Sequence, residues 1–200
     1  FDPVTGAPIC KDSAQCKFFG MPIVSDTVVI YFDNYWAMSA STKDGKTPLN
    51  DVKNKLIDLI DDLPDGVKIQ VKNSSAGNLY LDSAFGELTE LNKETRKEAI
   101  DWILDTPEFS QATGQSSLNL PNYIPDMARY FRSDQNEVGQ IIALSSVVHG
   151  NFVGRCTGGP YDSVEGCLRS GNRIREERDM KTIRVDTINF SHKENGCNGN

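Results

Sequence analysis

The chain has 200 residues, a length that fits one domain or at most two. Hydrophobic residues make up 38% of it and charged residues 24%, which is typical of a globular protein and excludes gross disorder or a collagen-like chain. The net charge of −7 argues against nucleic acid as the main partner, because phosphate backbones repel an acidic chain. The longest apolar run, residues 28–32, is far shorter than the roughly 20 residues that membrane insertion requires.

The cysteines favour an oxidising compartment. Cys10 and Cys16 lie near the start of the chain, while Cys156 and Cys167 flank a glycine-rich stretch. Such terminal and loop positions are typical of disulfides in extracellular domains. We therefore predict the pairs Cys10–Cys16 and Cys156–Cys167 in a secreted or cell-surface protein, with Cys197 left over. The sequence does not fix this connectivity, and five reduced thiols in a cytosolic protein remain an alternative.

The first half of the chain predicts a strand and then a helix. Residues 1–25 show little periodicity, so we expect an irregular N-terminal segment. Residues 27–33 are almost continuously apolar, β-branched or aromatic, a pattern that predicts a strand buried on both faces of a parallel sheet. Thr47 can cap a helix whose first residue is Pro48, and the sequence predicts that this helix ends before residues 64–66.

Strands and helices continue to alternate along the rest of the chain. Further strands are predicted at residues 67–71, 78–81, 138–148 and 182–190, and further helices at residues 94–104, 123–131 and 164–178. Strands separated by helices form βαβ units. The predicted fold class is therefore α/β, a three-layer sandwich of a mainly parallel central sheet with helices on both faces. We expect residues 26–190 to form this domain, before a polar tail at residues 191–200.

Several segments, in this order along the chain, resemble a known family. Asp33-Asn34-Tyr35-Trp36-Ala37-Met38 follows the first buried strand and precedes an amphipathic helix. A strand that ends in Asp-Asn-x-x-x-Met before such a helix resembles the start of a von Willebrand factor A domain. Arg96 resembles an arginine that this family carries inside a helix. Residues 116–118 and 128–132 resemble a stretch of the members associated with type IV pili, and residues 141–146 lie where the family has an apolar strand ending in Thr-Asp-Gly.

The family's metal site is degenerate in this sequence. The resemblance implies a divalent ion held by oxygens of an Asp, two Ser, a Thr and a second Asp. Asp33 matches the first Asp, and Ser117 could replace the Thr, but Tyr35 and Ala37 replace the two serines and Ser146 replaces the second Asp. Hard cations need about six oxygen ligands with compensating carboxylates. We therefore expect no metal and no cofactor at this position.

We interpret the chain as a binding module and not as an enzyme. The predicted binding residues are Asp33, Asn34, Tyr35, Trp36, Ser117 and Ser146. Adjacent aromatic side chains in a loop can carry interface energy or stack on a sugar ring. Core packing beneath the loop would explain Tyr35 and Trp36 equally well, and Asp33 could simply bond neighbouring loop amides.

The resemblance implies extracellular adhesion to a protein or glycan, as part of a pilus or surface filament, with other filament subunits as further partners. One alternative is a purely structural subunit of a filament or matrix. Another is a hydrolase, which would need a histidine beside a serine or cysteine. The sequence has only 2 histidines and no Gly-x-Ser-x-Gly motif, which disfavours this reading.

Overall fold

The computed structural model describes residues 16–33, 36–39, 41, 45–74, 88–107, 130–131, 137–145 and 164–189. Their strands are β1 (Lys17–Phe18), β2 (Met21–Pro22), β3 (Thr27–Asp33), β4 (Lys68–Ser74), β5 (Thr89–Glu90), β6 (Gln140–Ser145) and β7 (Arg184–Asn189). Their helices are the 3-10 helix η1 (Trp36–Ser39) and the α-helices α1 (Pro48–Asp62), α2 (Lys93–Asp105) and α4 (Val164–Glu177).

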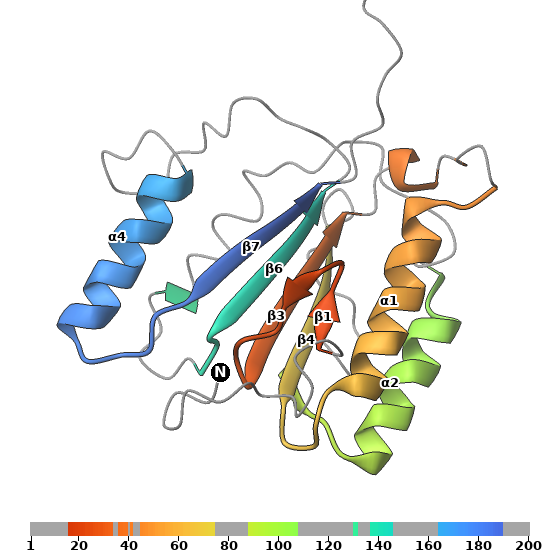
Figure 1. The fold of residues 1–200 in the computed structure, drawn as a ribbon, viewed down its shortest axis with the longest axis horizontal. Coiled ribbons are helices and arrows are strands. Elements are labelled where there is room, and N and C mark those ends of the chain that lie inside the picture. The colour runs from red at the N-terminus through yellow and green to blue at the C-terminus, as the bar shows by residue number, and fades with distance from the viewer. Residues whose placement is uncertain are drawn as a thin grey trace, which may run out of the picture.

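Five strands form one mostly parallel sheet in the order β5-β4-β3-β6-β7. The central strand β3 pairs in parallel with β4 on one side and with β6 on the other, and β6 pairs in parallel with β7. Among the described strands of this sheet, only β5 is antiparallel, to β4. Helices α1 and α2 lie on one side of the sheet and α4 on the other (Figure 1). The predicted α/β class with a mainly parallel sheet is therefore confirmed.

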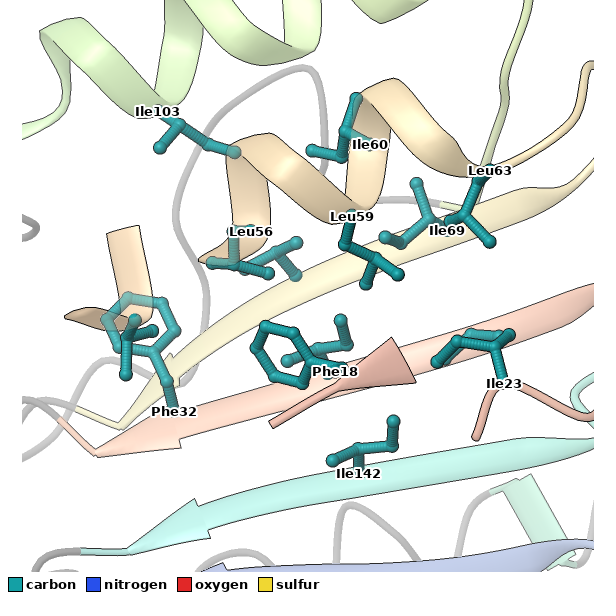
Figure 2. Close-up of a cluster of buried hydrophobic side chains, with 14 of the residues drawn as sticks. Phe18, Ile23, Phe32, Leu56, Leu59, Ile60, Leu63, Ile69, Ile103 and Ile142 are labelled. Carbon is teal, nitrogen blue, oxygen red and sulfur yellow. The ribbon is translucent and has the colours of Figure 1, made fainter. Parts of the chain in front are cut away.

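Alternating residues of the central strands face two separate cores, as the period of a strand requires. Val28, Ile30 and Phe32 belong to the core beneath α1, together with Ile142 of β6. Figure 2 shows this core, with Leu56 and Leu59 of α1 directed at the strands. The near-continuous apolar run in β3 is thus explained by burial on both faces of the sheet.

The second core lies on the opposite face and includes Val29, Tyr31 and Phe131. Helix α4 comes close to Phe131, because a Cβ built on Gly171 would lie 2.6 Å from the Phe131 Cδ1 atom. Arg175 of the same helix is 1% exposed. Its guanidinium donates to the carbonyl oxygen of Lys181 at 2.6 Å and to that of Tyr130 at 3.1 Å. These two hydrogen bonds hold α4 against the segments that contain Lys181 and Tyr130.

Both helices beneath the first core begin at side-chain caps. The Thr47 hydroxyl accepts a hydrogen bond from the backbone N–H of Asn50 at 3.1 Å, and Pro48 occupies the first turn, as predicted. Asn92 accepts from the N–H groups of Glu94 and Thr95, and the Thr95 hydroxyl accepts from the Asn92 N–H, which completes a capping box. Residue 94 was the expected start of α2, and the box places it one residue earlier.

The expectation of an irregular segment is wrong for residues 17–22. Lys17–Phe18 and Met21–Pro22 pair as an antiparallel hairpin, the β1–β2 hairpin. Phe18 is 0% exposed and belongs to the core beneath α1, where Figure 2 shows it between the helix and the strands. Strands of two residues show no detectable period. Pro22 in β2 argues against a strand in the sequence, although a proline is compatible with so short a pairing at an edge. The sequence therefore contains no signal for the hairpin.

The buried side chain of Gln140, which is 0% exposed, fastens this hairpin to the sheet. Its amide nitrogen donates to the carbonyl oxygen of Pro22 at 3.0 Å and to the Asp186 carboxylate at 2.7 Å, while its amide oxygen accepts from the Val24 N–H at 2.9 Å. One side chain at the start of β6 therefore joins the hairpin, β6 and β7.

A second difference lies at β5, where the sequence predicts no strand. Thr89–Glu90 pairs antiparallel with Ile69 and Lys68 of β4. The predicted strand at 78–81, most of the predicted helix at 123–131 and the tail at 191–200 lie outside the described residues. None of the helices in the described ranges is long and apolar enough to cross a membrane.

At the amino edge of the sheet, an ion pair between Asp26 and Lys181 predicts a pH-dependent contribution to stability. The ammonium of Lys181 donates to the Asp26 carboxylate at 2.8 Å, and this bond is the main reason why the pKa of Asp26 is lower than its usual value. A lowered carboxyl pKa stabilises the fold at a pH above the unfolded-state pKa, and this contribution disappears as the pH falls through the folded-state pKa. Because the Asp26 side chain is 57% exposed, we expect less than about 1 kcal/mol.

Urea unfolding between pH 2 and pH 6 should therefore show a smaller decrease in stability for Asp26→Asn than for the unchanged protein. The two proteins should differ most above pH 4 and converge towards pH 2. A difference that stays constant over this range would contradict the assignment.

Candidate binding site at the carboxyl edge of the sheet

The carboxyl ends of the parallel strands meet at one edge of the sheet. The register places Asp33 beside Ser74 of β4 and Phe32 beside Leu144 of β6, while Ser145 lies beside Asn189 of β7. The candidate residue Ser146 directly follows β6. Asp33 and Ser145 therefore occupy the ends of neighbouring strands, and Ser146 is the next residue in the sequence.

The strand order reverses at this same point. After β3 the chain passes through α1 to β4, on one side of β3, whereas after β6 it passes through α4 to β7 in the opposite direction. In open α/β sheets, ligands bind in the crevice beyond the strand ends where the order reverses. This switch point lies between β3 and β6, at the strand ends formed by Asp33 and Ser145.

The segment after β3 is held to the core by Met38. Its side chain is 0% exposed and belongs to the core beneath α1. The 3-10 helix η1 also contacts α1 directly. The final residue of the Asp-Asn-x-x-x-Met pattern is thus an anchor, which fixes the backbone on the far side of the predicted binding residues.

The predicted site residues are described to different degrees. For Asp33, at the end of β3, and Trp36, the first residue of η1, the structure describes the backbone position only. Asn34, Tyr35, Ser117 and Ser146 lie outside the described residues. The topology thus places Asp33 beside the end of β6, and contacts among the six side chains remain predictions.

A buried lysine that the sequence did not predict lies just before this edge. Lys72 of β4 is 5% exposed, in register with Tyr31. Its ammonium lies 5.6 Å from the ring centroid of Tyr31 and 4.9 Å from that of Tyr130, within the range of cation–π interactions. The Tyr130 hydroxyl donates to the Gln70 amide oxygen at 2.6 Å. Gln70 and Lys72 of β4 are consequently buried next to the second core.

The signal for Lys72 was present in the sequence. Lys68, Gln70 and Lys72 alternate with apolar residues, which predicts a strand with one polar face. Gln70 and Lys72 are nevertheless 6% and 5% exposed. Only the structure shows that Tyr130, 58 positions later than Lys72, covers them.

Arg96 has a structural role at the other end of the domain. Its guanidinium donates to the carbonyl oxygen of Ile60 in the last turn of α1, and it also pairs with the Asp65 carboxylate at 2.8 Å. It therefore satisfies a helix-end carbonyl and fixes α2 against α1. The helix arginine that contributes to the resemblance is not part of the carboxyl edge.

No group of three or more histidine, cysteine or acidic side chains within the described ranges is arranged to hold a metal ion. His149 and His192, the histidines that the hydrolase alternative needs, lie outside those ranges.

A solved structure named von Willebrand factor type A from Catenulispora acidiphila is similar to this chain, with a TM-score of 0.54 and 16% sequence identity. The similarity covers 84% of this chain and 34% of that one, so the chain spans about a third of that protein's length. The fold is von Willebrand factor A-like. No family model and no curated protein matches the sequence.

Proposed function

We propose that this von Willebrand factor A-like domain is a binding module that recognises a protein or a glycan at the carboxyl edge of its sheet, without a metal ion and without catalysis. The observation that carries the proposal is the switch point between β3 and β6, bordered by the segment that Met38 anchors. A fixed backbone on both sides of a short loop is suited to presenting recognition residues.

The residues proposed to contact the ligand are Asn34, Tyr35 and Trp36, with Asp33, Ser117 and Ser146 beside them. Tyr35 and Trp36 are the strongest candidates, because large aromatic side chains with a polar group supply much of the binding energy in protein interfaces. Sugar rings are the second ligand class that such side chains suit.

The proposed independence from metal rests on the ligands that the sequence supplies. Ala37 lies in η1 and has no side-chain oxygen, and Tyr35 replaces the other serine. Asp33 would then be the one certain anionic ligand, which is too little to offset the dehydration of Mg²⁺ or Ca²⁺ at high affinity.

To test the proposal, the domain would be screened against an array of glycans and matrix proteins, and its best ligand would be titrated with variants. Tyr35→Ala combined with Trp36→Ala is expected to weaken binding at least about tenfold, because hot-spot residues contribute about 2 kcal/mol or more each. The melting temperature should remain nearly unchanged, and EDTA should leave the affinity unchanged.

Trp102 provides the matched control. It is half-buried on α2, packs against the core beneath α1 and is not one of the six predicted binding residues, so Trp102→Ala should lower stability and leave the affinity intact. A double variant that melts much earlier would place Tyr35 and Trp36 in the core. An array without any ligand would favour the purely structural filament subunit, and a dependence of binding on Mg²⁺ would contradict the metal-free site.

We further propose a secreted or cell-surface location, in a pilus or another surface filament. The location is supported by the cysteine positions and the filament by the sequence resemblance at residues 116–118 and 128–132.

Mass spectrometry after alkylation without reduction is expected to find the Cys10–Cys16 and Cys156–Cys167 pairs and an alkylated Cys197. Each disulfide closes a short loop, and such bridges stabilise a fold by about 2–4 kcal/mol. Five alkylated thiols would remove the argument for an extracellular location.

A further inference from the structure

A cavity of about 500 Å³ separates the turn of the β1–β2 hairpin from the last turns of α1. We call it the hairpin groove. Its lining residues are Lys17, Phe19 and Gly20 of the hairpin and Lys55, Asp58, Leu59, Asp61 and Asp62 of α1. Its volume falls in the range of roughly 300–1,000 Å³ that ligand pockets occupy. Because α1 starts after the carboxyl edge and ends just before β4, the groove lies away from the candidate binding site.

The groove has an apolar wall with an aromatic ring. Leu59 is 2% exposed, and Phe19 is half-buried. The Phe19 ring packs edge-to-face against Phe18, with the ring centroids 5.0 Å apart and an interplanar angle of 76°. Phe18 itself is fully buried, so it fixes the turn from which Phe19 lines the groove.

The rim of the groove carries more negative than positive charge. Three aspartates and two lysines line it. The Lys55 ammonium lies 3.2 Å from the Asp58 carboxylate, so these two charges compensate each other. Asp61 and Asp62 are exposed, and the described part of the chain gives neither of them an ion pair. Among the remaining lining residues, the single positive charge of Lys17 is then set against the two carboxylates of Asp61 and Asp62.

The end of α1 adds to this negative potential. The carboxyl end of a helix carries a partial negative charge, which basic residues in the last turn usually compensate. Helix α1 has no basic residue in its last turn and ends with Asp61 and Asp62 instead. Arg96 approaches the Ile60 carbonyl and Asp65, but it does not line the groove. The carboxylates and the helix end thus favour a cation at the same place.

We propose that the hairpin groove binds an arginine-bearing segment of a protein partner. The guanidinium would lie between the Phe19 ring and the carboxylates of Asp61 and Asp62. An arginine fits better than a lysine, because its planar group can stack on an aromatic ring while it forms paired hydrogen bonds to a carboxylate. This interaction surface is separate from the carboxyl-edge site and does not depend on the function proposed for it.

The test uses a fluorescein-labelled peptide with three arginines spaced by glycines, measured by fluorescence anisotropy in 150 mM NaCl. Asp61→Asn combined with Asp62→Asn is expected to weaken binding at least about tenfold, and Phe19→Leu at least about threefold. The same peptide with lysines should bind about tenfold more weakly to the unchanged protein. Removing carboxylates from a helix end should not lower the melting temperature, so weaker binding would not reflect unfolding.

The matched control removes two exposed acids from α2, as Glu98→Gln with Asp105→Asn. We expect this variant to bind the arginine peptide within about twofold of the unchanged protein, since diffuse charge is largely screened at this ionic strength. Equal losses in the two double variants would show general attraction to an acidic protein and overturn the proposal. Equal affinity for the lysine peptide would overturn the role of Phe19, and displacement of the peptide by micromolar Ca²⁺ would identify a cation site instead.

Discussion

Replacing Phe18 by Ala is expected to lower the free energy of unfolding by about 3–5 kcal/mol, the usual effect of truncating a large buried aromatic side chain. Phe18 is 0% exposed and lies among residues from three parts of the chain, including Leu59 of α1 and Ile142 of β6. Figure 2 shows its ring between the helix and the sheet. The β1–β2 hairpin would retain few other apolar anchors, so we expect it to detach first.

The neighbouring residue provides the control. Phe19→Ala removes the same number of atoms from a half-buried ring and should lower stability by less than half as much. Urea unfolding of both variants gives the comparison, and hydrogen exchange of residues 16–24 would reveal local detachment. If Phe18→Ala unfolded at the same urea concentration as the unchanged protein, the hairpin would not belong to the core.

Most of the central sheet could be predicted from the sequence, because its elements are long and strongly patterned. The apolar run in β3 and the helical spacing in α1 each extend over seven residues or more, so local signals and the tertiary environment agree. The β1–β2 hairpin and β5 consist of strands of two residues. Such short strands form because they pair with other segments, and two residues are too few to show a local pattern that predicts them.

The candidate site was only partly predictable for a related reason. Alternation along β4 identifies a strand with one polar face, but it does not say whether solvent or protein covers that face. Tyr130 contacts both Gln70 and Lys72. Because Tyr130 is far from β4 in the sequence, the local pattern of β4 could not predict these contacts. Asp33 could be placed at a strand end because β3 is unambiguous. The reversal of strand order beside it depends on how β6 pairs, which the sequence does not state.

The second large effect is expected at Gly139, where the chain leaves no space for a side chain. Gly139 is buried just before β6, and its N–H donates to the Thr27 carbonyl oxygen at 3.1 Å, while its carbonyl oxygen accepts from the Arg184 N–H at 3.0 Å. A Cβ at this position would lie 2.2 Å from the Ser25 Oγ atom and 2.8 Å from the Lys181 Cε atom. These backbone bonds to two neighbouring strands prevent Gly139 from moving away.

Ser25 and Lys181, the two residues that a Cβ at position 139 would contact, differ in how easily their side chains can move away. Lys181 is long and exposed, so it can swing aside with the loss of its ion pair to Asp26. Ser25 is 2% exposed, and its hydroxyl accepts from the Thr27 N–H at 3.2 Å, which holds it in place. We therefore expect Gly139→Ala to lower the free energy of unfolding by about 3 kcal/mol, at the upper end of the usual effect of overpacking.

A compensating change distinguishes this clash from a general sensitivity of the position. Ser25→Gly removes both Ser25 atoms that crowd the new Cβ, at the expense of about 1 kcal/mol for the lost hydrogen bond to Thr27. Ser25→Gly combined with Gly139→Ala should consequently be more stable than Gly139→Ala alone, although each change destabilises by itself. Urea unfolding of the four proteins gives the coupling energy, for which we expect at least about 1 kcal/mol. Additive effects would mean that the strands separate to accept the methyl group, so that close packing at this edge does not hold β3 and β6 together.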